Sequence, residues 1–394
     1  MRKSLLYIFL LLPFPIVAQK LDSNRAGMLA EIEKNNTTLI ALRQQAEADK
    51  AQNRVGNALP DPTFGFSYSW GNKSGMEGKK TFSAEQELDL GTLTRKRSKL
   101  AKSANAVIDW NYRLERQTIL AEADLLLVQL VYHNANCEEL SSRMERAKLL
   151  KEVYEKKMLA GDANQIELNK IRLFHTSAMA NYKRAQAERA VTLDELQRLN
   201  GNQPVQYGHT EYSTIDLPTL NVLEEKAMDL SPLIQSANAN IKQEKENLKL
   251  NKIEALPGVS IGYTGEHVGG NNYNGVSVGV SVPLWGNSRR KVSQQRTAVL
   301  AAEMNKHDAE NQILSKMKLQ YDNAKSLLEL SKQYKTELAN NEDLKILEKA
   351  LKAGQISLLE YLTEVAFYDN ARSEVLSIER DSQLAISQLF SIFQ

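Results

Sequence analysis

The side chains that most often carry chemistry are scattered through this sequence rather than grouped. Its five histidines stand apart from one another, and the one near the single cysteine, His133 four residues before Cys137, makes a pair with too few ligands for a metal site. The motifs G-x-S-x-G, Walker A and H-E-x-x-H do not occur. A formal net charge of +2 provides no basic field for nucleic acid. The sequence therefore predicts no enzyme, no metal site, no cofactor and no nucleic-acid partner.

Two glutamates do stand at matching positions, each six residues after a glycine that interrupts a helical tract. They are Glu167, after Gly161, and Glu360, after Gly354. The stretches NQIE and SLLE, which end at these glutamates, fit the capping box. In that motif a side chain at the helix start and a glutamate three residues later each bond the backbone N–H of the other. Local spacing therefore assigns a capping role to both carboxylates.

The first residues, MRKSLLYIFLLLPFPIVAQ, have the organisation of a secretory signal peptide over residues 1–19. Removing them takes Arg2 and Lys3 from the 50 basic residues and leaves 48, against 48 acidic residues. No cysteine stands at the cleavage site to carry a lipid. No later stretch approaches the roughly 20 apolar residues of a membrane-spanning helix. A secreted chain of this kind is either soluble or a component of a β-barrel.

Proline and glycine are distributed so unevenly that they define long helical tracts. In each of two tracts the only breaker is one glycine, Gly161 in the first and Gly354 in the second. Residues 92–160 and 287–353 are therefore each expected to form one helix of roughly 100 Å, at about 1.5 Å per residue. Each glycine is expected to end its helix and let the chain turn back as a helical hairpin.

Apolar residues recur along the first tract at the spacing of helices that pack side by side. Val107, Leu114, Ala121, Val128 and Ala135 follow one another every seven residues, and charged residues occupy the other faces. This heptad pattern indicates coiled-coil packing, although a bundle core or an isolated charged helix has the same pattern. The length of the tract favours an elongated coiled structure.

Four short stretches have the alternating pattern of β-strands instead. They are residues 63–70, 80–90, 259–267 and 273–283. In the first of them, Phe64, Phe66, Tyr68 and Trp70 alternate with glycine and serine, which predicts one apolar face and one small polar face. Lengths of about 8 to 11 residues match strands that cross an outer membrane at a tilt.

The strands and helical tracts recur as an internal duplication. The motif ALP occurs at residue 58 and again at residue 255, and the glycine of the helical turn recurs 193 residues after its first occurrence. Each repeat reads helix, strand, strand, long helix, tight turn, helix. The duplication divides the mature chain into a first repeat, a linker and a second repeat, at residues 20–203, 204–231 and 232–394.

The four predicted strands cannot close a barrel by themselves, and a sheet with open edges cannot exist in lipid. Two chains would supply about 8 strands and three chains about 12, and a barrel of about 8 is filled by its own side chains. The small glycine and serine side chains of the polar face favour an open lumen and hence three chains or more. A small soluble sheet is the alternative.

This layout resembles the TolC family of outer-membrane efflux proteins over essentially the whole mature chain. The resemblance rests on the paired ALP motifs, on the glycine turns, and on the strand-to-helix corners ELDLG (87–91) and VPLWG (282–286), each followed by a basic cluster. The C-terminal run from Gly354 to Phe390 adds to it. The stretch EQELDLG, which begins at Glu85, also resembles the heavy-metal (cobalt-zinc-cadmium) branch of the family.

The resemblance implies a mainly α-helical protein with a small β part that works as a homotrimer. Its three chains would share a 12-stranded β-barrel in the outer membrane of a Gram-negative bacterium and an α-helical barrel through the periplasm. Phe64, Phe66, Tyr68 and Trp70 would face outer-membrane lipid. Such a protein is a passive exit duct for an inner-membrane pump, to which a periplasmic adaptor joins it. A type I protein-secretion outlet and a secreted coiled-coil scaffold are the alternatives.

For the helical turns the resemblance implies two roles. Gly161 and Gly354 with their neighbours would dock the adaptor, and Glu167 and Glu360 would line the aperture that closes the periplasmic end. A plain hairpin turn and a capping box are the structural alternatives, and capping is compatible with the aperture role. Nine residues after the second glycine, where a family member can carry another acid, stands Thr363.

Overall fold

The computed structural model describes residues 23–55, 57–58, 60–73, 75–88, 93–213, 215–282, 286–338 and 343–393. The predicted signal peptide, residues 1–19, lies outside the described residues. Parts of the two strand-to-helix corners, residues 89–92 and 283–285, also lie outside them.

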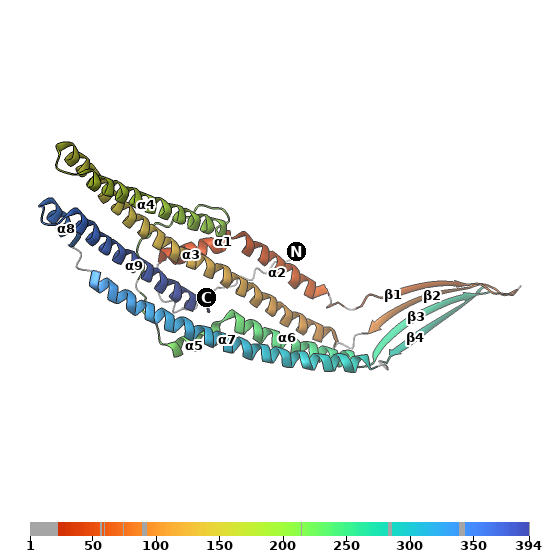
Figure 1. The fold of residues 1–394 in the computed structure, drawn as a ribbon. Helices are drawn as coiled ribbons and strands as arrows, with labels where there is room; N and C mark the ends of the chain where they lie inside the picture. The colour runs from red at the N-terminus through yellow and green to blue at the C-terminus, as the bar shows by residue number, and fades with distance from the viewer. Residues whose placement is uncertain are drawn as a thin grey trace, which may run out of the picture. The chain divides into compact units, whose positions relative to one another are not determined.

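The described chain is mainly helical with a small β part, as the sequence predicts (Figure 1). Its elements are, in order, α1 (Ser23–Asn35), α2 (Thr37–Val55), β1 (Thr63–Ser69), β2 (Lys79–Leu88), α3 (Leu93–Ala160), α4 (Gln165–Leu199), α5 (Leu220–Leu230), α6 (Pro232–Glu254), β3 (Gly258–Val268), β4 (Asn271–Ser281), α7 (Asn287–Leu338), α8 (Asp343–Lys352) and α9 (Leu358–Phe390).

The long helices follow the breaker pattern wherever the structure describes them. Helix α3 is uninterrupted up to Gly161, with 68 residues. In the second tract, where a single helix is predicted over residues 287–353, the described residues form α7 and α8. Residues 339–342, between these two helices, lie outside the described residues.

The chain forms two compact units, each built from several separate segments. The first takes its described residues from Met1–Thr37, Leu120–Pro218 and Tyr321–Gln388, and the second from Thr38–Ile119, Thr219–Gln320 and Leu389–Gln394. Each unit combines segments of both sequence repeats, because the long helices α3 and α7 contribute to both units. The first unit contains both glycine turns, and the second contains the strands β1 to β4.

In the second unit the four strands form one antiparallel sheet in the order β1-β2-β3-β4 (Figure 1). Phe66 pairs with Phe82 across β1 and β2, and Thr264 pairs with Gly275 across β3 and β4. The central pair, β2 and β3, joins strands from different repeats. The sheet therefore connects the two repeats within one layer.

The pairing register gives the sheet two unlike faces, because successive side chains of a strand point to opposite sides. One face is mostly small and polar. The other carries the large apolar side chains Phe64, Phe66, Phe82, Val276, Val278 and Val280. Phe66 is 73% exposed and Val276 is 81% exposed. Within the described chain this apolar face of the sheet is therefore uncovered.

The link between β3 and β4 is shorter than the sequence suggests. The stretch 268–272 predicts a hairpin loop, but β3 continues to Val268 and β4 begins at Asn271. Gly269 and Gly270 alone connect them, with φ of +58° and +81°. Two successive left-handed residues make a type I′ turn, whose twist matches that of a hairpin. Strand pairing therefore extends up to the turn.

The core of the first unit lies where its helices pack against one another. Of the predicted heptad positions in this unit, Val128 is buried, and Ala121 and Ala135 are partly buried; Val107 and Leu114, which belong to the second unit, are partly buried there. Other completely buried side chains are Ile32 of α1, Leu130 of α3, Leu196 of α4 and Ile386 of α9. Among the helices that the structure describes, none is both long enough and apolar enough to cross a membrane.

Candidate functional site

The turn between α3 and α4 is built on a glycine in the left-handed region. Gly161 has φ of +83°. The N–H of Asp162 donates to the carbonyl of Lys157 at 2.8 Å, and the N–H of Gly161 donates to the carbonyl of Met158 at 3.2 Å. This is the bond pattern of a Schellman motif, which ends a helix and reverses the chain.

The turn between α8 and α9 has the same backbone conformation. Gly354 has φ of +67°. The N–H of Gln355 donates to the carbonyl of Ala350 at 2.9 Å, and the N–H of Gly354 donates to the carbonyl of Leu351 at 3.2 Å. Both predicted helix-ending glycines therefore occupy the position where a side chain would be strained.

The two glutamates after these turns cap the helices that follow. Glu167 Oε2 accepts a hydrogen bond from the N–H of Asn164 at 3.1 Å, and Asn164 Oδ1 accepts one from the N–H of Glu167 at 2.9 Å. At the second turn, Glu360 Oε2 accepts from the N–H of Ser357 at 2.7 Å, and Ser357 Oγ accepts from the N–H of Glu360 at 3.2 Å. The capping boxes predicted from local spacing are confirmed.

Capping also affects the charge of Glu360. The hydrogen bond from the backbone of Ser357, followed by that with its side chain, lowers the pKa of the Glu360 carboxyl below its ordinary value. Glu360 is exposed, and Glu167 is half-buried. Thr363, one turn further along α9, is exposed and donates its hydroxyl to the carbonyl of Leu359 at 2.9 Å. At neutral pH Glu360 is therefore ionised, at the surface of its turn.

A small apolar cluster joins the two turns within the first unit. Tyr154 of α3, Leu168 and Ile171 of α4, and Leu358 of α9 are buried against one another. Leu358 is the first residue of α9, so the cluster fixes the start of that helix against the hairpin of α3 and α4. Partly buried residues pack around it, namely Leu150, Met158, Ala163 and Leu362.

Alanine at either turn glycine is expected to destabilise the first unit. A Cβ in the left-handed conformation of Gly161 or Gly354 costs about 1–2 kcal/mol, whatever the surrounding space. The space itself is open at both positions. Gly27 is the matched control, since it lies inside α1 with open space at its Cβ position, and alanine there is expected to stabilise by about 0.5–1 kcal/mol. Denaturant unfolding of the three variants measures these differences, and effects of the same sign at all three positions would contradict the backbone argument.

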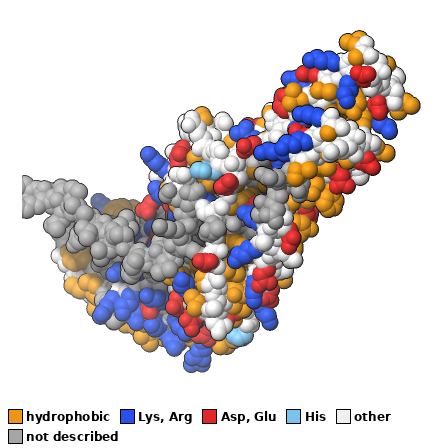
Figure 2. All heavy atoms as spheres, turned by 90° about the vertical axis from the view of Figure 1, so that its left-hand side faces the viewer, with side chains coloured by type: hydrophobic (Ala, Val, Ile, Leu, Met, Phe, Trp, Pro, Cys, Tyr) orange, Lys and Arg blue, Asp and Glu red, His pale blue; other side chains and the backbone are white. Residues whose placement is uncertain are grey.

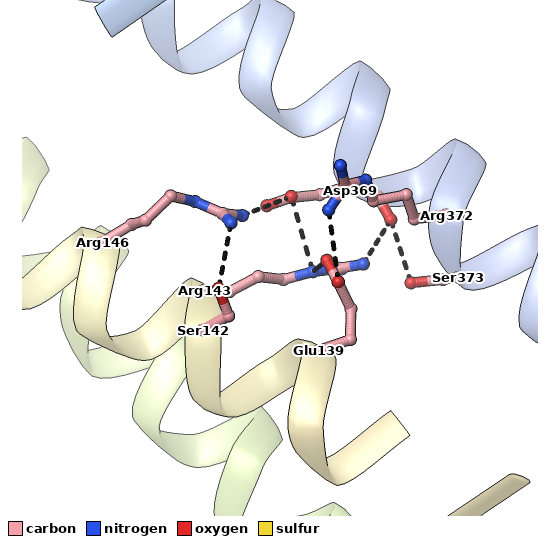
Figure 3. A network of polar contacts seen from close by, with 7 residues as sticks. All are labelled: Glu139, Ser142, Arg143, Arg146, Asp369, Arg372 and Ser373. Atoms are coloured by element: carbon pink, nitrogen blue, oxygen red, sulfur yellow. Dashed lines mark hydrogen bonds and ion pairs between the residues drawn. The ribbon is translucent and has the colours of Figure 1, made fainter. Parts of the chain in front are cut away.

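Further along the helices, a network of charged residues joins α3 to α9 (Figure 3). Asp369 of α9 accepts a hydrogen bond from Arg146 Nη2 at 2.8 Å, and Arg143 Nη2 donates to the backbone carbonyl of Asp369 at 2.7 Å. Glu139 accepts from Arg143 Nε at 2.9 Å and lies 3.4 Å from Nη1 of Arg372. Three arginines and two carboxylates thus bridge the two helices.

This network is largely removed from solvent. Burial raises the pKa of Asp369, and Arg143 and Arg146 oppose that rise. Sequence reasoning missed the network, although Glu139, Arg143 and Arg146 stand at one-turn spacing on α3. The missing partner is distant, because Asp369 lies 223 residues from Arg146 and no local pattern points to it.

The strand residues predicted to face lipid lie together on the apolar face of the sheet. Phe64 stacks on Phe82 of β2 with ring centroids 6.4 Å apart, and Tyr68 and Trp70 are 6.5 Å apart. Trp70 directly follows β1 and is 80% exposed. Within the described chain, the predicted aromatic residues, Phe66 included, are uncovered.

Other reactive side chains form no site in the part of the chain that the structure describes, where no three His, Cys, Asp or Glu residues are grouped to hold a metal ion. Cys137 is a free cysteine beside a shallow pocket that Arg189 and Tyr182 also line. Burial raises the pKa of its thiol, which keeps it protonated at neutral pH. Figure 2 shows side chains of both charge signs interspersed with hydrophobic ones, so the face seen there has no uniform field.

In comparisons with known proteins, no family model and no curated protein matches the chain.

Solved structures do match the fold of the chain. A membrane protein from Pseudomonas aeruginosa has a TM-score of 0.77 over 95% of this chain and 94% of its own, at 16% identity. The Campylobacter jejuni outer membrane channel CmeC has a TM-score of 0.75 over 94% of this chain and 85% of its own, at 18% identity. The Neisseria gonorrhoeae outer membrane channel MtrE, in its open state, has a TM-score of 0.75 over 94% of this chain and 88% of its own, at 16% identity. The chain shares their fold.

This outer-membrane channel fold confirms, at the level of architecture, the resemblance to TolC-family proteins that the duplicated layout predicts. Identities of 16% to 18% mean that the likeness lies in the order and length of the elements rather than in particular side chains. Assignment to the heavy-metal branch stays a prediction.

Proposed function

We propose that the protein is the outer-membrane exit duct of a tripartite efflux system in a Gram-negative bacterium. The observation that carries the proposal is the fold, which two outer membrane channels share over 94% of this chain. In this role the chain performs no chemistry on its cargo. An inner-membrane pump drives the substrate, a periplasmic adaptor joins the pump to the duct, and the duct is a passive conduit.

The sheet supports an integral position in the outer membrane. Its apolar face is uncovered within the described chain, and both edge strands, β1 and β4, are left without a neighbour on one side. Lipid tolerates such a face but no open edge. Three copies that pair edge to edge would close a barrel of about 12 strands, with Phe64, Phe66, Tyr68 and Trp70 facing lipid.

The two glycine turns are proposed to be the periplasmic end of the duct, where the adaptor docks around Gly161 and Gly354. Exposed apolar side chains beside the turns support a docking role, because they offer surface for a partner. Leu159 is 90% exposed, and Ile166 and Leu359, each five residues after a turn glycine, are also exposed.

The duct is proposed to be gated at this end. In a threefold assembly Glu167 and Glu360 would each form a ring of carboxylates at the aperture, which favours cations. The network of Asp369 with Arg143 and Arg146 supports a closed resting position, because it ties α9 to α3 within each chain. One related structure is described as an open state, so a neighbour of this fold adopts that state.

The experiment that tests the proposed function is a measurement of the protein mass of the mature chain after extraction in detergent, by light scattering with the detergent contribution subtracted. We expect a trimer that stays with outer membranes after a high-salt wash. A stable monomer that is soluble without detergent would overturn the duct and favour the secreted coiled-coil scaffold, since the apolar sheet face would then need no lipid.

Charge at the aperture is expected to set ion selectivity. Glu360→Lys, or Glu360→Ala combined with Glu167→Ala, is expected to reduce the preference for cations or to increase leak in planar bilayers, because the carboxylate rings are lost. Glu360→Gln is the matched control, since glutamine can keep the capping bonds while it removes the charge. If Glu360→Lys and the double alanine variant leave conductance and selectivity unchanged, the carboxylates only cap helices. If Glu360→Gln changes selectivity as the charge-removing variants do, charge rather than lost capping is the cause.

A further inference from the structure

On the small-residue face of the sheet, the size of the side chains increases along the strands toward the turns. A row across its middle holds only glycine, serine and threonine, namely Gly65, Ser83, Thr264 and Gly275. Toward the turn between β3 and β4, the same face carries the large side chains of Lys79, Glu266 and Tyr273. These three belong to consecutive strands, β2, β3 and β4.

The three large residues form one connected group. Lys79 Nζ lies 2.6 Å from Oε1 of Glu266, which is an ion pair across β2 and β3. Tyr273 is the Cα partner of Glu266 on β4, so their side chains stand next to each other on this face. Tyr273 is 60% exposed. Most of its surface is therefore free of contact with the rest of the described chain.

The opposite face changes from apolar to polar at the same level. Nearer the helices lie the phenylalanine pair and the valines, whereas the row nearest the turn holds Lys80, His267 and Asn272 beside Tyr68, an aromatic residue with a polar hydroxyl. His267 Nδ1 and Asn272 Oδ1 are 2.7 Å apart. In a lipid-embedded barrel, such a change marks the edge of the hydrocarbon layer. The group of Lys79, Glu266 and Tyr273 thus stands at one mouth of the barrel.

We propose that Lys79, Glu266 and Tyr273 form an outer constriction of the duct, a ring of large side chains that limits the size of what leaves the barrel. The inference rests on the proposed function, because the ring exists only when three copies close one barrel. The helices occupy the other end of the strands, so this mouth opens to the exterior. The ion pair cancels the charges of Lys79 and Glu266, and the ring therefore selects by size rather than by charge.

The first test places a thiol at the ring and follows the current through single channels in planar bilayers. Cys137→Ser serves as the parent, because it removes the one native thiol. In this parent, Tyr273→Cys is expected to lose current when a charged methanethiosulfonate reagent is added. The same channel before addition is its own control for folding. Asn272→Cys, the next residue on the opposite face, is expected to keep its current.

A second measurement uses the exclusion of uncharged polymers of graded size. Tyr273→Ser, and separately Lys79→Ser with Glu266→Ser, are expected to admit larger polymers without a shift in ion selectivity. Labelling of Tyr273→Cys, verified by mass, with no loss of current would overturn the inference. An unchanged polymer limit in both serine variants would overturn it as well. A parent that forms no channel at all would overturn the proposed function itself, and with it the ring.

Discussion

Arg25→Met is expected to destabilise the first unit by about 3–5 kcal/mol, the usual cost of removing one partner from a buried ion pair. Arg25 Nε and Nη2 each donate to a carboxylate oxygen of Asp124 at 2.5 Å, and Nη2 also donates to Ser387 Oγ at 2.5 Å. The Asp124 side chain is only 3% exposed. Without arginine the charge of Asp124 is buried and uncompensated, and α1 loses its ion pair with α3 and its hydrogen bond to Ser387 of α9.

The measurement is chemical denaturation of the detergent-solubilised protein, followed by helical circular dichroism. Arg198→Met is the matched control, because Arg198 pairs with Glu122, also on α3, at 2.8 Å, but both side chains are at least half exposed. That variant is expected to cost about 0–1 kcal/mol. Arg25→Met with Asp124→Leu is expected to recover much of the loss, since neither charge then stays buried. Equal losses for the two single variants would contradict the assignment.

Asp369→Ala is expected to cost about 1.5–3 kcal/mol, the range for hydrogen bonds to charged groups. Arg146 then loses its carboxylate partner, whereas Arg143 keeps Glu139 and the backbone carbonyl of residue 369. Asp381→Asn is the control on the same helix, because the Asp381 side chain is 45% exposed in its pair with Arg380 and its loss should cost less than about 1 kcal/mol. If the network holds the gate closed, Asp369→Ala also increases leak in planar bilayers, and Asp381→Asn does not.

The pH dependence of the same site has a defined sign. Because burial raises the pKa of Asp369, the folded chain binds this proton more tightly than the unfolded chain. The protonated Asp369 carboxyl therefore contributes its whole stabilising effect below the ordinary carboxyl pKa of about 3.9. This contribution is lost as pH rises through the raised pKa of the folded chain. Asp369→Asn cannot titrate, so its stability deficit relative to wild type is expected to shrink as pH rises through that window. A stability deficit that grows as pH rises would mean that the arginines lower the pKa of Asp369 by more than burial raises it.

Local sequence patterns are sufficient to predict the long helix α3 and the two glycine turns. The absence of proline and glycine over most of the first tract predicts α3, and the single glycines predict both reversals, because only glycine enters the left-handed conformation cheaply. The same spacing predicts the capping roles of Glu167 and Glu360, whose partners lie three residues away.

Contacts between distant segments could not be predicted in the same way. Arg25 and Asp124 are separated by 99 residues, and Arg146 and Asp369 by 223, so neither pair leaves a periodic or local trace. A charged residue on a helix looks the same in the sequence whether it meets solvent or a buried partner. Only the packing of α1, α3 and α9 distinguishes Asp124 and Asp369 from the many exposed carboxylates.

The sequence by itself determined the helix and strand types, the duplication, the two glycine turns and the alternation that separates the faces of the sheet, because each depends on residues within a few positions of one another. The tertiary structure alone decided the strand order, the pairing register and the buried ion pairs. The register also brings Lys79, Glu266 and Tyr273 to two adjacent rows of one face. The physical reason is that these features depend on which distant segments pack together, and packing free energy is shared over many side chains rather than encoded in any one stretch.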